Sequence, residues 1–95
     1  ITYGNKGIGV SCLCPQAVRT AMTAQGAGVA GVDGMIEPEV AAADVLDAIE
    51  NERFLVTPHA EVLEYVSRKG NDRDRWISGM QRLQERYEDW KPGDE

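Results

Sequence analysis

The sequence predicts an α/β fold, because two short apolar segments, each ended by a proline, flank a helical pattern. The first segment covers residues 8–14 and the second covers residues 53–57. Proline has no N–H to donate to a strand ladder, so it ends a strand inside a sheet. A strand, a crossover helix and a second strand form a right-handed unit whose strands run parallel. We therefore expect a parallel pair of strands, followed by two C-terminal helices.

The first strand follows a short N-terminal segment, residues 1–7, that is typical of the end of a helix. Ile8, Val10, Cys12 and Cys14 share one face by the period of two, and Leu13 lies on the other. A strand that is apolar on both faces is expected to be buried inside a parallel sheet. Ligands of open α/β sheets bind beyond the carboxyl ends of the strands. The chemistry is therefore expected just after Cys14.

The segment between the two strands contains a loop and a helix. Residues 21–36 are rich in Ala and Gly without a regular period, which predicts a mobile loop, with a turn of helix near residues 21–24. Such a loop is either functional or disordered, and we expect disorder or a displaced loop in this chain. Residues 37–51 form the helix, with Pro38 in the first turn and Glu37 and Glu39 at its positive end. The second strand, residues 53–57, follows.

The C-terminal part predicts two helices. His59, the only histidine, is expected to have a capping or solvent role rather than to bind a metal. A short helix covers residues 60–69, with Gly70 as its stop, and Asn71 or Asp72 caps the next one. That last helix carries an apolar stripe at steps of four and three, formed by Trp76, Met80, Leu83, Tyr87 and Trp90. The stripe either packs on this domain or forms an oligomer contact, and the polar residues 91–95 are expected to fray.

Composition excludes several classes of function. The chain has 16 acidic and 10 basic residues and a net charge of −6, which argues against binding to nucleic acid or to an anionic membrane surface. No apolar run approaches the ~20 residues of a membrane span. Cys12 and Cys14 point to the same face of a strand, in a geometry poorly suited to bridging each other. We therefore expect a reduced, cytoplasmic protein.

The 95 residues make at most one domain, which we expect to be partial. The chain begins with Ile1 rather than Met, and the first strand starts a few residues later, so the N-terminus is interpreted as a cut, natural or experimental. A signal peptide of the longer parent protein would then be invisible. We divide the chain into residues 1–20 (helix tail, strand and turn), 21–36 (loop), 37–57 (crossover helix and strand) and 58–95 (C-terminal helices).

The segment Gly7-Ile8-Gly9-Val10-Ser11-Cys12-Leu13-Cys14-Pro15, followed by Val18-Arg19-Thr20, resembles the sixth strand and following turn of the short-chain dehydrogenase/reductase family. Members typically read Gly-Ile-x-Val-x-x, two apolar residues, then Pro-Gly-x-Val-x-Thr. One position departs from that pattern, because Gln16 stands where the family usually has Gly. The resemblance is less specific through Val56, and beyond it rests on the order of elements. It implies the C-terminal portion of a Rossmann-like, doubly wound parallel sheet.

The resemblance also implies roles for five residues. Pro15 and Gln16 would line the nicotinamide pocket of NAD or NADP, and the Val18 backbone would hydrogen-bond the carboxamide of the cofactor. The Thr20 hydroxyl would sit near the carboxamide or the phosphates, and Met22 with the following loop would contact a small-molecule substrate. The parent would thus transfer a hydride between NAD or NADP and a carbonyl or alcohol. An ordinary strand exit is the alternative for this turn.

Two parts of such an enzyme are missing from this sequence. The glycines between residues 26 and 34 do not follow a strand and do not form a phosphate-binding turn. Tyr3 and Lys6 are three apart, not the four that would place a catalytic pair on one helix face, and are interpreted as the end of a helix. We predict no catalytic residue and no bound cofactor in this chain, and a homo-oligomer. The alternative is a non-enzymatic interaction or oligomerisation module. The substrate, and the choice between NAD and NADP, stay open.

Overall fold

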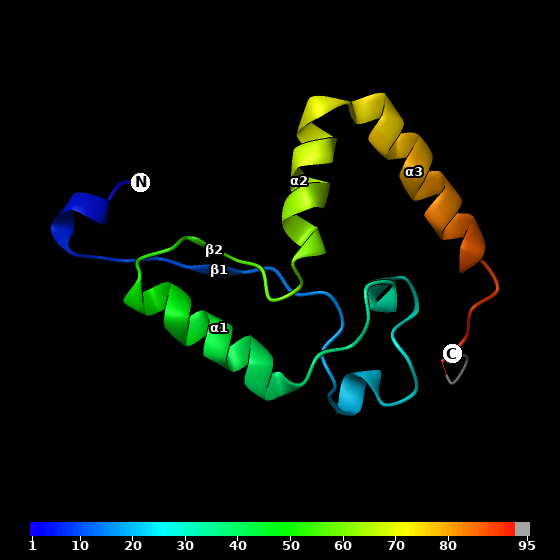
Figure 1. Cartoon of the computed structure of the whole chain (residues 1–95), viewed down its shortest axis with the longest axis horizontal. Coiled ribbons are helices and arrows are strands. Elements are labelled where there is room, and N and C mark those ends of the chain that lie inside the picture. Colours follow the sequence, from blue (N-terminus) through cyan, green and yellow to red (C-terminus); the bar gives the residue numbers. More distant parts are fainter. Residues whose placement is uncertain (93–95) are drawn as a thin grey trace.

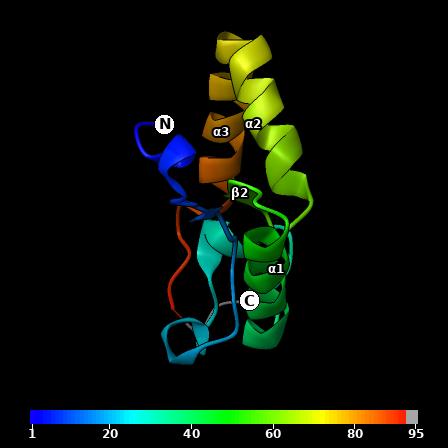
Figure 2. The same cartoon turned by 90° about the vertical axis from the view of Figure 1, so that its left-hand side faces the viewer.

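The computed structural model describes residues 1–92, which form a mixed α/β arrangement of three α-helices and a two-stranded parallel sheet (Figure 1). In both views, α1 lies on one side of the strands, and α2 and α3 rise on the other (Figure 2). None of these helices is both long and apolar enough to cross a membrane. The elements in chain order are β1 (Cys12–Leu13), α1 (Pro38–Glu50), β2 (Leu55–Val56), α2 (Glu61–Asn71) and α3 (Arg73–Arg86).

The two strands pair in parallel, as expected, but over a shorter length than the sequence predicts. Cys12 pairs with Leu55 and Leu13 with Val56, and the Cys14 N–H donates to the Val56 carbonyl over 2.9 Å. The strand was expected over residues 8–14. It is short because β2 lies between the end of α1 and Pro58, which leaves residues 8–11 little to pair with. Ile8 and Val10, expected to be buried, are 54% and 68% exposed.

Helix α1 begins and ends where local chemistry dictates. Glu37 is the extended N-cap and Pro38 occupies the first turn, where its missing N–H costs no hydrogen bond. The helix ends in a Schellman motif, in which the Arg53 N–H donates to the Ala48 carbonyl over 2.8 Å. Glu52 adopts the left-handed conformation this motif needs, with φ of 55°, although it has a side chain. The expected crossover helix is therefore confirmed, within one residue of its predicted ends.

The buried core of the described residues is small. It lies between α1, β2 and the turn after β1, and it consists of Ala17, Ala41, Ala48, Val56 and His59. Of these, Ala48 and Val56 are fully buried. Many larger apolar side chains remain exposed, including Leu46 at 68% and Phe54 at 61%. Apolar surface on this scale marks faces that are suited to contact another part of a protein or a second chain.

The loop between the strands is closed at its neck, in contrast to the disorder we expected. The Arg19 N–H donates to the Ile36 carbonyl over 2.8 Å, and the Ile36 N–H donates to the Ala17 carbonyl over 3.1 Å. The Ala17 N–H in turn donates to the Ala30 carbonyl over 3.0 Å. Two 3₁₀ turns shape the loop, Ala21–Thr23 and Gly28–Gly31, and the first lies where a helical turn was expected. These bonds satisfy backbone groups that a displaced loop would leave to water.

The N-terminal segment and the C-terminal helices differ in detail from expectation. The helix tail is a single 3₁₀ turn, Gly4–Lys6, ended by Gly7 at φ of 82°. Helix α2 continues through Gly70, so this glycine is not its stop. The expected cap of the last helix is confirmed, because the Asp72 carboxylate accepts from the Arg75 N–H over 3.1 Å. Helix α3 ends at Arg86, before the stripe does.

The apolar stripe of the last helix contacts its own chain at both ends. Trp76 faces α2, where the Lys69 ammonium lies 4.6 Å from its ring centroid. Trp90 covers Gly28 so closely that a Cβ there would stand 3.1 Å from the ring. Met80 between them is 40% exposed. Packing on its own chain thus accounts for the ends of the stripe, and the oligomer contact stays a prediction. Residues 93–95 of the predicted fraying tail lie outside the described residues.

Candidate functional site

The turn after β1 is held in place by the buried imidazole of His59. The Gln16 N–H donates to His59 Nδ1 over 3.0 Å, and His59 Nε2 lies 3.2 Å from the Gly34 carbonyl oxygen. Because Nδ1 accepts, Nε2 must carry the proton and donate to Gly34. Of the two roles expected for His59, capping or solvent, the solvent role was wrong, because the side chain is only 3% exposed. The imidazole instead ties the turn to the far end of the loop.

A second network fixes the side chain of Gln16. Its Nε2 donates to Asp33 Oδ2 over 3.3 Å, and the Tyr65 hydroxyl donates to the Asp33 oxygens Oδ1 and Oδ2 over 2.7 and 2.9 Å. The hydrogen bond to the Asp33 carboxylate is the largest cause that raises the pKa of Tyr65, and partial burial adds to it. Asp33 therefore joins the turn, the loop and α2 through one carboxylate.

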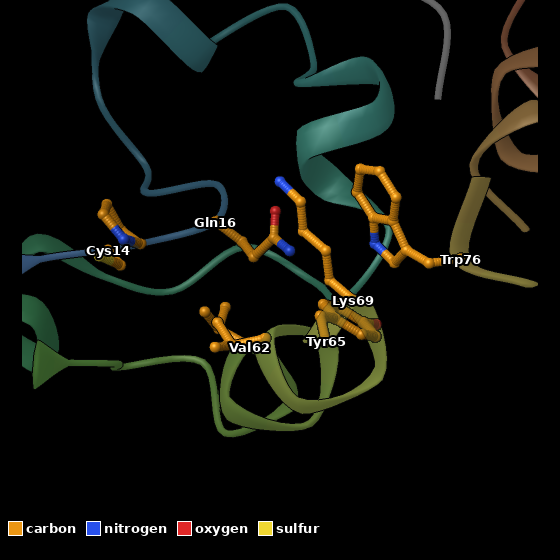
Figure 3. A pocket seen from close by; sticks show the side chains of 8 residues that line it. Cys14, Gln16, Val62, Tyr65, Lys69 and Trp76 are labelled. Carbon is orange, nitrogen blue, oxygen red and sulfur yellow. The ribbon is translucent and has the colours of Figure 1, made fainter. Parts of the chain in front are cut away.

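These contacts border an open pocket of about 240 Å³ (Figure 3). Its walls come from three segments: the turn after β1, one face of α2, and the first turn of α3. The lining residues are Cys14, Pro15, Gln16, Val62, Tyr65, Val66, Lys69 and Trp76. The pocket thus lies beyond the carboxyl end of β1, which is where ligands of open α/β sheets bind.

The structure brings two of the five predicted site residues to this pocket. Pro15 and Gln16 line it, whereas Val18, Thr20 and Met22 do not. Val18 forms a parallel bridge with Ile36, in which the hydrogen bonds are made by the backbone groups of Ala17 and Arg19 on either side of it. The Val18 N–H itself has no acceptor among residues 1–92. The Thr20 N–H donates to Thr23 Oγ1 over 3.0 Å at the start of a 3₁₀ turn. Met22 is 93% exposed on that turn.

Sequence reasoning missed Tyr65 and Lys69, which both line the pocket. They are four residues apart on α2, and this spacing places two side chains on one helix face. The four-residue spacing is visible in the sequence, but the pair considered there was Tyr3 and Lys6. Lys6 lies in a 3₁₀ turn and Tyr3 just before it, and the Lys6 ammonium is 5.3 Å from the Tyr3 ring centroid. A proton-transferring tyrosine needs a lowered pKa. The raised pKa of Tyr65 indicates a structural hydroxyl instead.

The two cysteines lie side by side as free thiols, and Cys14 lines the pocket. Their sulfur atoms are 3.7 Å apart, which confirms that both side chains point the same way. The hydrogen bond with Cys12 raises the pKa of Cys14, and desolvation contributes in the same direction. In residues 1–92, no group of three or more His, Cys, Asp or Glu side chains could hold a metal ion.

Comparisons with protein-family models, with curated proteins and with solved structures found no match to this chain. Functional inference therefore rests on the residues and on the geometry of the turn and pocket.

Proposed function

We propose that this chain is the C-terminal part of a short-chain dehydrogenase/reductase, whose longer parent transfers a hydride between NAD or NADP and a carbonyl or alcohol group of a small molecule. In this proposal the turn from Pro15 to Thr20 forms the wall beside the nicotinamide ring. In this proposal the chain on its own is not catalytic, because its sequence holds no phosphate-binding glycine turn. The Tyr-x-x-x-Lys pair that lines the pocket, Tyr65 and Lys69, has a tyrosine whose pKa is raised rather than lowered.

The observation that carries the proposal is the unpaired backbone donor at Val18, in the part of the chain that the structure describes. The neighbouring N–H groups of Ala17 and Arg19 are used in closing the loop, whereas the Val18 N–H has no acceptor within residues 1–92. A backbone donor without an acceptor among residues 1–92, just past the carboxyl end of a parallel strand, suits the carbonyl oxygen of a carboxamide. This is the contact that the family resemblance assigns to Val18.

Gln16, the departure from the family pattern, is compatible with this role. Its side chain is held toward Asp33, and its backbone N–H is occupied by His59. The proline before it still ends the strand. The glutamine therefore takes part in bracing the turn, and its side chain extends from the turn toward Lys69 (Figure 3).

Uncovered apolar surface also supports a larger, Rossmann-like parent sheet. Ile8, Val10 and Leu13 are between 44% and 68% exposed, along a segment that is suited to a sheet interior. Neighbouring strands and helices of a doubly wound sheet would cover them. We further propose a cytoplasmic enzyme that assembles as a homo-oligomer. A non-enzymatic interaction module is the second candidate, and the 40% exposure of Met80, in the middle of an aromatic stripe, is the observation in its favour.

The proposal is tested in the longer protein, whose sequence should hold a Tyr-x-x-x-Lys pair about 20–25 residues before Cys12 and a glycine-rich turn near its start. In that protein, Thr20→Ala should weaken binding of the dinucleotide by about 0.5–1.5 kcal/mol, the net contribution of one neutral hydrogen bond. Thr20→Val keeps the shape and tests the hydroxyl, and Thr2→Ala is the matched control outside the turn. Unchanged cofactor affinity in both Thr20 variants, with folding intact, would remove Thr20 from the site.

A further inference from the structure

The pocket beside the turn is small and open to solvent. Its volume is about 240 Å³. This is less than the roughly 300–1,000 Å³ of pockets that hold drug-sized molecules. A ligand of this pocket is therefore about as large as one aromatic ring with a single polar substituent.

Most of the pocket wall is apolar. Pro15 and Val66 are among the apolar lining residues. Figure 3 shows Val62 of α2 on one side of the pocket, and Trp76 of α3 opposite Gln16. An indole face and branched aliphatic side chains favour a flat or branched apolar body, which they contact without leaving polar atoms unpaired. A fully polar ligand, such as a sugar, would find few partners on these walls.

Lys69 supplies the charge of the pocket. Its side chain extends between Gln16 and Trp76, with the ammonium 4.6 Å from the indole centroid (Figure 3). None of the ion pairs within residues 1–92 includes Lys69. The aromatic ring restricts the ammonium to the pocket side without neutralising it, because a cation over a ring keeps its full charge.

Two carboxylates close to the pocket are engaged by other side chains. Asp33 accepts hydrogen bonds from Tyr65 and from Gln16. On the same helix, Glu64 pairs with Arg68. The ammonium of Lys69 is thus the group that remains available to an anion, in a protein whose overall charge is −6.

We propose that this pocket binds a small organic carboxylate whose body is an aromatic ring or a branched alkyl group. The carboxylate pairs with the Lys69 ammonium, and the body lies between Pro15, Val62 and the Trp76 indole. The inference goes beyond the proposed oxidoreductase activity and concerns this chain by itself. It holds whether or not the longer protein binds a dinucleotide, so the failure of one idea leaves the other standing.

Benzoate is the probe, and benzamide is its neutral counterpart of nearly the same shape. Each is titrated into the ¹⁵N-labelled 95-residue chain, and the amide shifts are followed by NMR. Benzoate should shift the amides of Gln16, Lys69 and Trp76 in a saturable manner, with a Kd on the order of 1–5 mM for a ligand of this size. Benzamide should bind at least about fivefold more weakly, because it lacks the negative charge that pairs with the Lys69 ammonium.

Two variants separate a built site from general attraction. Lys69→Met keeps the apolar stem and removes the charge, and should weaken benzoate at least about fivefold while abolishing the preference over benzamide. Lys6→Met is the matched control, because Lys6 also lies over an aromatic ring, that of Tyr3, but does not line this pocket. The proposal is overturned if benzamide binds as tightly as benzoate, or if benzoate does not bind in a saturable manner. It is also overturned if the benzoate affinity falls equally in both variants, or if it does not fall in Lys69→Met.

Discussion

Replacing His59 by alanine tests how the turn is built. The variant removes the acceptor of the Gln16 N–H and the donor to the Gly34 carbonyl, both at a ring that is 3% exposed. Each neutral hydrogen bond contributes about 0.5–1.5 kcal/mol net, and a buried donor left unpaired costs about 1–3 kcal/mol. We expect His59→Ala to lower the free energy of unfolding by about 2–4 kcal/mol. Urea denaturation followed by tryptophan fluorescence measures it.

A partial replacement keeps the test informative if the alanine variant fails to fold. In His59→Asn, the side-chain oxygen stands near the position of Nδ1 and can accept from Gln16, but nothing reaches Gly34. This variant should recover about 1 kcal/mol relative to alanine and should keep the Gln16 amide protected from hydrogen exchange. If His59→Ala stays within about 0.5 kcal/mol of the unmodified chain, with the Gln16 amide still protected, the account of the turn is wrong.

Three further outcomes follow from the structure. The pKa of Tyr65 is raised, chiefly by its hydrogen bond to Asp33, so this pair stabilises the fold below the ordinary tyrosine pKa of about 10 and loses that effect as pH rises through the raised value. Urea midpoints across alkaline pH should therefore fall less steeply in Tyr65→Phe, and equal slopes would contradict this. Glu52→Gly should raise stability by about 0.5–1 kcal/mol in urea denaturation, because glycine adopts positive φ without strain; a loss of stability would count against the Schellman motif. Sedimentation equilibrium should show a dimer or a larger oligomer. Val10→Lys should dissociate it if the strand forms the contact, and Leu83→Glu should do so if the helix stripe forms it. A monomer at every concentration, with cooperative unfolding, would refute the oligomer.

Local chemistry made the helices predictable from the sequence. Pro38 marked the start of α1, and the cap of α3 is Asp72, one of the two residues, Asn71 and Asp72, that were predicted for it. Gly70 was wrongly predicted to end α2. A glycine is tolerated inside a helix at a cost of about 1 kcal/mol, so a glycine alone does not mark where a helix ends. The strand length was overestimated, since periodicity shows which side chains share a face but not how long the partner strand is.

The site was only partly predictable because its members come together through long-range contacts. Pro15 and Gln16 were found from the local pattern of the turn. His59 was misjudged, because the residues that bind it, Gln16 and Gly34, lie 43 and 25 positions away in the sequence. Lys69 was missed even though its spacing from a tyrosine was visible, since nothing local indicates that α2 faces the turn. The closure of the loop likewise depends on backbone bonds that have no residue signature.

Calorimetric titration of NADH and NADPH tests the central claim most directly, with this 95-residue chain and the longer parent protein measured side by side. The pyrophosphate site supplies most of the binding energy of a dinucleotide, and this sequence holds no glycine-rich turn that would form such a site. The account predicts saturable binding of one of the two cofactors to the longer protein, and none to the isolated chain. Micromolar binding to the isolated chain, or no binding of either cofactor to the longer protein, would contradict it.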